Sequence, residues 1–166
     1  MNGFSVAEAG HFVNVLPPVS ISGGVTGQAF NVGNCEHVSI QIQFGVFGAA
    51  LPTAILVKGC TTAAGAGATA IPFRYYLATS GGTSVDTTSP PVVATSAGIL
   101  AAVLGKINAT FVLIEIDSVE LEQALGDGYK YLQVSITDSG NVTYASISAI
   151  LSGQRFAYQG GLTETV

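Results

Sequence analysis

Apolar and polar residues alternate along several segments of this chain. In residues 38–44 every second position is apolar (Val38, Ile40, Ile42 and Phe44), and the positions between them are Ser or Gln. Successive side chains of a β-strand point to opposite faces, so this alternation predicts a strand with one buried face. The same reasoning predicts strands at 11–16, 19–21, 38–44, 54–60, 70–78, 111–117, 129–137 and 144–152, with a final edge segment at 155–158.

Loops rich in Gly, Ser, Thr and Ala separate these segments. About eight short strands with frequent turn signals are typical of an antiparallel sandwich or barrel. We therefore predict an all-β fold, namely an antiparallel β-sandwich of jelly-roll-like form. Residues 1–18 are expected to form an extended N-terminal arm, and residues 19–166 a single sandwich domain.

Turn and cap signals predict three local features. Pro17-Pro18 should end the first strand, because proline cannot donate to a central ladder. The strands at 129–137 and 144–152 should pair as a hairpin across the turn signal between them. Asp117-Ser118-Val119-Glu120 has the spacing of a capping box, which predicts a short helix that ends near Gly126.

The N-terminal arm is the predicted interaction surface. It is apolar, it ends in Pro17-Pro18 and it precedes the main strands, so we expect it to clasp a neighbouring subunit. The alternative is that it forms an ordinary first strand of the sheet. The interface residues predicted on this basis are Phe4, Phe12, Val13, Val15, Leu16, Pro17 and Pro18.

The chain is poor in charge. Only 9% of its residues are charged, whereas a typical globular domain has about 25%. Charged side chains keep soluble surfaces apart, so this composition predicts a surface covered by neighbouring subunits. The formal net charge is −5 and the five Lys and Arg residues are scattered singly, which argues against nucleic-acid binding.

No apolar stretch reaches the roughly 20 residues of a spanning helix, and the first residues do not resemble a secretory signal, so we expect no membrane association.

The chain contains no motif that is typical of catalysis or metal binding. His11 and His37 have none of the spacings of a metal site, so we expect them at loop edges or partner contacts. Cys35 and Cys60 fit small core residues, and whether they pair is left open. No serine stands in a Gly-x-Ser-x-Gly elbow. We predict that the chain is not an enzyme and needs no metal or cofactor.

Glu115 and Asp117 stand two residues apart, on the same side of a predicted strand. Paired carboxylates can cleave glycosidic bonds, but such pairs lie in clefts rich in aromatic residues, and this chain has no Trp. We expect Asp117 to cap the following helix and Glu115 to pair with Lys130 or Arg74.

Six stretches of the chain share a pattern with a known group of proteins: residues 9–18, 21–24, 70–76, 111–117, 120–121 and 149–157. They resemble small structural proteins of tailed bacteriophages and prophages. The resemblance covers most of the chain and implies a component of the virion, with roles in capsid decoration, head–tail joining or tail building. It brings no active-site residues.

Together these observations predict a capsid decoration (cement) protein. It would bind the major capsid protein on the outer surface of a phage head and self-associate, as a homotrimer. An acidic chain is expected outside the head, because contact with packaged DNA requires Lys and Arg. The alternatives are a tail-tube or head–tail connector subunit and, less favoured, a carbohydrate- or receptor-binding module that uses Tyr75, Tyr76 or Tyr158.

Overall fold

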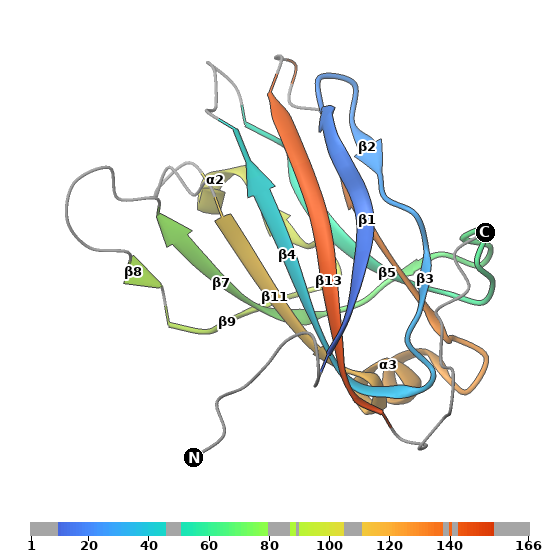
Figure 1. The fold of residues 1–166 in the computed structure, drawn as a ribbon. Helices are drawn as coiled ribbons and strands as arrows, with labels where there is room; N and C mark the ends of the chain where they lie inside the picture. The colour runs from blue at the N-terminus through green and yellow to red at the C-terminus, as the bar shows by residue number, and fades with distance from the viewer. Residues whose placement is uncertain are drawn as a thin grey trace.

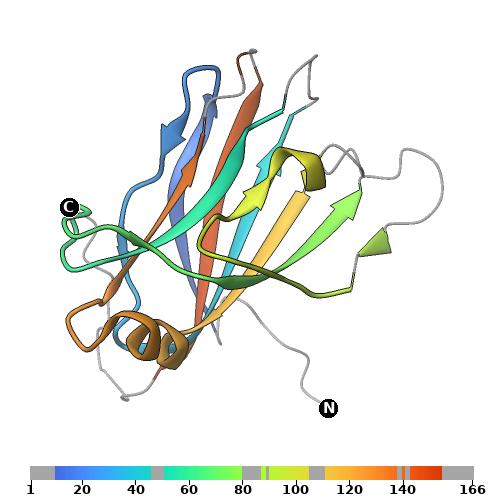
Figure 2. The same cartoon turned by 180° about the vertical axis from the view of Figure 1, so that it is seen from behind.

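Two antiparallel β-sheets pack face to face in the computed structural model of this chain (Figures 1 and 2). The structure describes residues 10–45, 51–79, 87–88, 90–104, 111–137, 140 and 143–154. Two sheets of antiparallel strands around a shared core confirm the predicted all-β sandwich. Its jelly-roll-like form stays a prediction.

The first sheet, in front in Figure 1, contains the longest strands. Its order across the described residues is β1 (Gly10–Ser20), β13 (Tyr144–Gln154), β4 (Cys35–Phe44), β11 (Phe111–Asp117), β7 (Phe73–Thr79) and β8 (Thr87–Thr88), and β9 (Val92–Ala94) also pairs with β7. The first sheet therefore runs from β1 at one edge to β7 and its two short partners at the other.

The second sheet lies behind the first and is in front in Figure 2. Its order across the described residues is β10 (Ile99–Leu100), β5 (Ala54–Cys60), β12 (Tyr131–Ile136) and β2 (Val25–Thr26), and β3 (Phe30–Asn31) pairs with β12 while β6 (Thr69–Ala70) pairs with β5. Two short helices, α2 (Ala101–Leu104) and α3 (Ser118–Leu125), lie at opposite ends of the sandwich.

The core consists of the inward side chains of both sheets. Val38, Ile40 and Ile42 of β4 are fully buried, and so are Val57 and Val134 of the opposite sheet. Burial of one such side chain stabilises the fold by about 1.5–3 kcal/mol. The alternation seen in the sequence is therefore the pattern of inward and outward positions on the first sheet.

The strands β12 and β13 do not form the predicted hairpin. They belong to different sheets: β12 pairs with β5, whereas β13 lies between β1 and β4. The connection between them crosses from one sheet to the other. Turn residues signal a change of chain direction, and this signal is the same whether the next strand pairs with the previous one or packs against it.

The prediction that Pro17-Pro18 ends the first strand is wrong. The strand β1 continues to Ser20, with register irregularities between Asn14 and Leu16 and between Leu16 and Val19. Among the described strands β1 lies at the edge of its sheet and pairs with β13 alone, so proline is tolerated there at a bulge.

Residues 10–18 of the predicted arm form part of this edge strand. Val13 and Val15 are only 5% and 3% exposed and belong to the core, as the alternative of an ordinary first strand predicts. Phe4 lies outside the described residues. An extended arm is therefore not seen in residues 10–18, and any clasping role for residues 1–9 stays a prediction.

The predicted helix after β11 is confirmed. The helix α3 ends at Leu125, and Gly126 follows with a φ of 96°, a conformation that glycine adopts without strain. Its Leu121 is buried at the end of the core. A Cβ on Gly59 of β5 would lie 2.8 Å from the Leu121 side chain, so glycine at this position lets the helix approach the sheet.

Gly98 lies in the loop that precedes β10, and a substitution there tests how closely this loop packs against β5. Its φ is +77°, and a Cβ there would overlap the carbonyl oxygen of Ile55. Gly98→Ala should therefore lose about 1–2 kcal/mol from left-handed strain and about 1–3 kcal/mol more from overpacking. Urea unfolding, followed by circular dichroism, measures the total loss of unfolding free energy.

Gly140→Ala is the matched control. Gly140 has a φ of +67°, close to that of Gly98, but a Cβ there would meet nothing within 4 Å, so this variant should show only the strain contribution. Equal losses of unfolding free energy in the two variants would show that the Gly98 contact does not constrain the fold.

Candidate functional site

The outward side chains of the first sheet form rows across its strands. The register places Phe12, Ile150, Ser39, Glu115 and Arg74 in one row, and Asn14, Ser148, Gln41, Leu113 and Tyr76 in the next. The positions on β1, β13 and β4 are uncharged in both rows, and the charged residues of the first row are Glu115 on β11 and Arg74 on β7. The face therefore has an uncharged half and a charged corner.

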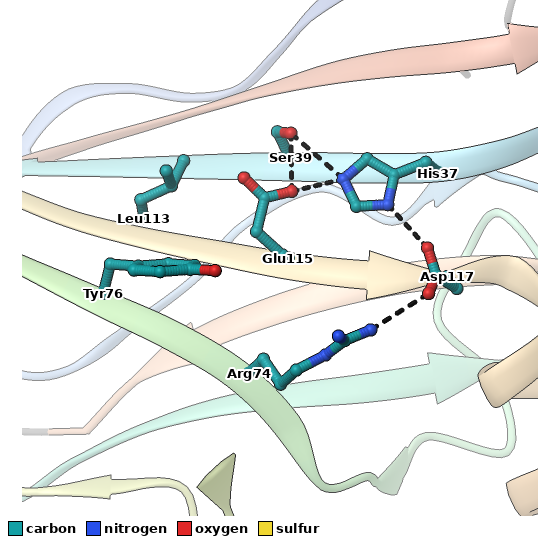
Figure 3. Close-up of a pocket in the computed structure, with 7 residues that line it drawn as sticks. All are labelled: His37, Ser39, Arg74, Tyr76, Leu113, Glu115 and Asp117. Atoms are coloured by element: carbon teal, nitrogen blue, oxygen red, sulfur yellow. Dashed lines mark hydrogen bonds and ion pairs between the residues drawn. The ribbon is translucent and has the colours of Figure 1, made fainter. Parts of the chain in front are cut away.

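The charged corner is centred on His37, which lies between two carboxylates (Figure 3). Its Nδ1 is 2.7 Å from Oδ1 of Asp117, and its Nε2 contacts Oε2 of Glu115. Ser39 donates a hydrogen bond of 2.7 Å to the same Glu115 oxygen. Both ring nitrogens thus face acceptors, which is the arrangement that favours the protonated imidazolium.

Arg74 extends this network from the neighbouring strand. Its Nη2 donates to Oδ2 of Asp117 at 3.0 Å and to Oε1 of Glu120, on α3, at 3.2 Å. Asp117 therefore accepts hydrogen bonds from His37 through one oxygen and from Arg74 through the other. The Asp117 carboxylate thus links β4, β7 and β11, and Arg74 links them to α3 through Glu120.

Two sequence-based assignments are corrected by this geometry. Asp117 precedes α3 but makes no side-chain capping hydrogen bond, and Glu115 pairs with His37 and Ser39 rather than with Arg74 or Lys130. The register accounts for the first outcome, since it places His37 directly opposite Asp117. It places Glu115 between Ser39 and Arg74, and Glu115 bonds Ser39, whereas Arg74 bonds Asp117 and Glu120. That pairing depends on which strands are neighbours, which the local sequence does not encode.

The pKa values follow from these contacts. Desolvation lowers the pKa of His37, but the hydrogen bonds to Asp117 and Glu115 and their negative charges outweigh it, so the pKa lies above its usual 6.5. The hydrogen bond from His37 is the main cause that holds the pKa of Asp117 below its usual 3.8; desolvation opposes it, and the charges of His37 and Arg74 reinforce it. The two groups are charged together over a wide pH range.

The charged corner borders a shallow hollow of about 420 Å³. The hollow is lined from β4, β7 and β11, and Leu113 and the ring of Tyr76 supply its less polar side (Figure 3). The complete lining is His37, Ser39, Arg74, Tyr76, Leu113, Glu115 and Asp117. Arg74 and Tyr76 join the site because β7 pairs with β11; their spacing of two residues was the available signal that they share a face.

Metal binding and disulfide formation are not supported among the described residues. There, no group of three or more His, Cys, Asp or Glu side chains is arranged to hold a metal ion. His11 stands on β1, opposite Leu151, and does not line the hollow. Cys35 and Cys60 are both buried, and neither forms a disulfide within the described part of the chain.

The predicted interface residues divide by burial. Phe12 is 57% exposed, Pro17 and Pro18 are exposed, and Leu16 is partly buried against the core that holds Val13 and Val15.

Of the three tyrosines considered for a carbohydrate platform, Tyr75 is buried in the core beside Phe73 with ring centroids 6.3 Å apart. Tyr76 lines the hollow, and Tyr158 lies outside the described residues.

The His37 network predicts a pH-dependent stability. Because the folded pKa of His37 is raised, its contribution is complete below pH 6.5 and is lost as the pH rises through the folded value. The lowered pKa of Asp117 acts in the opposite direction, so its contribution is complete above pH 3.8 and is lost as the pH falls through the folded value. Together they predict the strongest network between these two limits.

His37→Gln should remove the alkaline part of this dependence. The free energy of unfolding of the wild type should fall by about 1 kcal/mol or less above neutral pH, because the ion pairs are partly exposed, whereas His37→Gln should stay flat there. Urea unfolding at a series of pH values measures this, with His11→Gln as the control that keeps the wild-type slope. A wild-type slope in His37→Gln would contradict the assignment.

Comparisons with known proteins add no further information on the function of this site. No family model, no curated protein and no solved structure matches the chain. Among the described residues, the helices are too short to cross a membrane. The fold and the site are therefore interpreted from their own chemistry.

Proposed function

We propose that this chain is a structural subunit of a tailed-phage virion, and specifically a decoration (cement) protein on the outer surface of the head. Its partners are the major capsid protein and further copies of itself, as a homotrimer. It is assembled in the host cytoplasm and acts by binding, not by catalysis. The proposal joins the resemblance to phage structural proteins with the surface of the first sheet.

The observation that carries the proposal is the uncharged half of the first sheet. Along β1 and β13 the outward positions hold Phe12 and Asn14 next to Ile150 and Ser148. The cores of protein interfaces are depleted in charge and enriched in aromatic residues. Small hydroxyl and amide groups can be buried against a partner without the desolvation cost of a charge.

Phe12 is the candidate anchor of this surface. It is 57% exposed and stands opposite Ile150 on the neighbouring strand, so two apolar side chains are adjacent at the edge of the sheet. Large aromatic residues at the centre of an interface often supply most of its binding energy. Beyond Leu16 the edge has register irregularities and two prolines, which limit further strand addition.

Capsid binding tests the proposal. Phe12→Lys should weaken binding to heads assembled from the major capsid protein alone by about tenfold or more, because loss of an anchor costs about 2 kcal/mol. Cosedimentation with such heads measures the affinity. Deletion of residues 1–18 is unsuitable as a test, since it also removes the core residues Val13 and Val15.

Val93→Lys is the matched control. Val93 is 69% exposed and lies on β9 at the opposite end of the first sheet, so this variant adds the same charge away from the proposed interface. It should bind heads like the wild type. Equal binding by all three proteins would contradict the Phe12 interface, and binding to tails instead of heads would favour the tail-tube or connector alternative.

Self-association is tested separately by light scattering during size-exclusion chromatography. The wild type should run as a trimer, as the resemblance to decoration proteins implies. Phe12→Lys should shift the population toward the monomer if the same surface joins the copies, whereas Val93→Lys should not. A wild-type monomer at every concentration would contradict the trimer.

A further inference from the structure

We propose that the hollow over β4, β7 and β11 binds a neutral saccharide. This inference is independent of the proposed function, because it concerns the charged corner of the first sheet rather than its uncharged half. It rests on three features of the hollow: the polar atoms that remain available, their balance of charge, and the aromatic ring beside them.

Two of the charged side chains that line the hollow, Glu115 and Arg74, are only partly used by their neighbours. Within the described residues, Glu115 accepts hydrogen bonds through Oε2, so its Oε1 is available. Arg74 donates through Nη2, which leaves its Nη1 and Nε hydrogens available. Tyr76 contributes a hydroxyl that is directed toward the part of the hollow where Glu115 lies (Figure 3).

These atoms form a set of one strong acceptor, several donors and one hydroxyl that can act as either. A sugar hydroxyl donates one hydrogen bond and accepts others, so neighbouring hydroxyls can donate to Glu115 while they accept from Arg74. Hydrogen bonds to charged groups are roughly twice as strong as those between neutral groups. The set therefore matches a pair of adjacent hydroxyls.

The charges of the hollow select against ionic ligands. Among the residues that line the hollow, His37 and Arg74 are cationic and Glu115 and Asp117 are anionic, so these four carry no net charge; Glu120, which does not line the hollow, also pairs with Arg74. An anion would approach the two carboxylates, and a cation would approach the imidazolium and the guanidinium. A neutral ligand incurs neither repulsion.

The shape and the apolar side of the hollow suit a sugar ring. Its volume of about 420 Å³ falls within the roughly 300–1,000 Å³ of small-molecule sites. Tyr76 and Leu113, which are neighbours across β7 and β11, offer an aromatic ring and an aliphatic side chain to the C–H groups of the sugar. Aromatic rings provide such contact area together with a polar tip.

The His37 network positions the binding groups before a ligand arrives. His37 and Ser39 hold one oxygen of Glu115, and Asp117 and Glu120 hold one nitrogen of Arg74. Side chains that are already ordered lose less conformational entropy on binding. His37, Ser39 and Asp117 are thus positioning residues, and Glu115, Arg74 and Tyr76 are the proposed contacts.

Saturation-transfer difference NMR on the full chain tests the proposal. The probes are glucose, galactose, mannose and N-acetylglucosamine at millimolar concentration, with glucuronate and glucosamine as the charged analogues. At least one neutral sugar should receive saturation, and its charged analogue should receive several-fold less. Glu115→Gln should raise the dissociation constant of the sugar about tenfold, and Tyr76→Ala should abolish the saturation-transfer signal.

Tyr144→Ala is the matched control, because Tyr144 is 58% exposed on the same sheet but does not line the hollow. It should keep the wild-type signal. Tyr76→Phe keeps the ring without its hydroxyl and should bind more weakly than the wild type yet detectably, and circular dichroism verifies that each variant is folded. Absence of transfer to all four neutral sugars, or a signal unchanged in Tyr76→Ala, would overturn the proposal. Neither result would affect the capsid-binding test, which involves the other half of the sheet.

Discussion

The antiparallel register between β4 and β11 is the constraint on which both the core and the candidate site depend. It pairs Ile40 with Ile114 on the buried face and His37 with Asp117 on the outer face. A shift of one residue would turn every side chain of a strand to the opposite face. It would therefore bury the charges and expose the isoleucines. The hydrophobic core thus fixes the geometry of the ion pairs, although the ion pairs themselves contribute little to stability.

The first sheet separates two kinds of surface that the composition alone does not distinguish. The chain has few charges, and the structure gathers His37 and Arg74 with the carboxylates of Glu115, Asp117 and Glu120 at one corner of the first sheet. There they pair with one another, while the outward positions Phe12, Asn14, Ser148 and Ile150 on β1 and β13 are uncharged. This separation places the two proposed sites on different parts of one face: the interface at the β1 edge, and the ligand site over β7 and β11.

Strand positions were predicted well, because alternation is a local property. The segments at 38–44, 54–60 and 111–117 lie within or coincide with β4, β5 and β11, and the helix after Asp117 is present. Strand partners were predicted less well. The predicted hairpin of β12 and β13 was wrong. Each of these strands buries every second residue, and this alternation is the same whether the two strands pair in one sheet or lie in facing sheets. The proline pair was misread for a related reason, since its effect depends on whether the strand lies at an edge.

The sequence by itself determined the fold class, the inward faces of the strands and the scarcity of surface charge, because each follows from residue type and spacing along the chain. It also placed Glu115 and Asp117 on one side of a strand. Only the tertiary structure decided that His37 lies between these carboxylates, that Arg74 and Tyr76 join them, and that Val13 and Val15 belong to the core. These outcomes depend on which strands are neighbours, and that order follows from packing the whole chain into two sheets around one core.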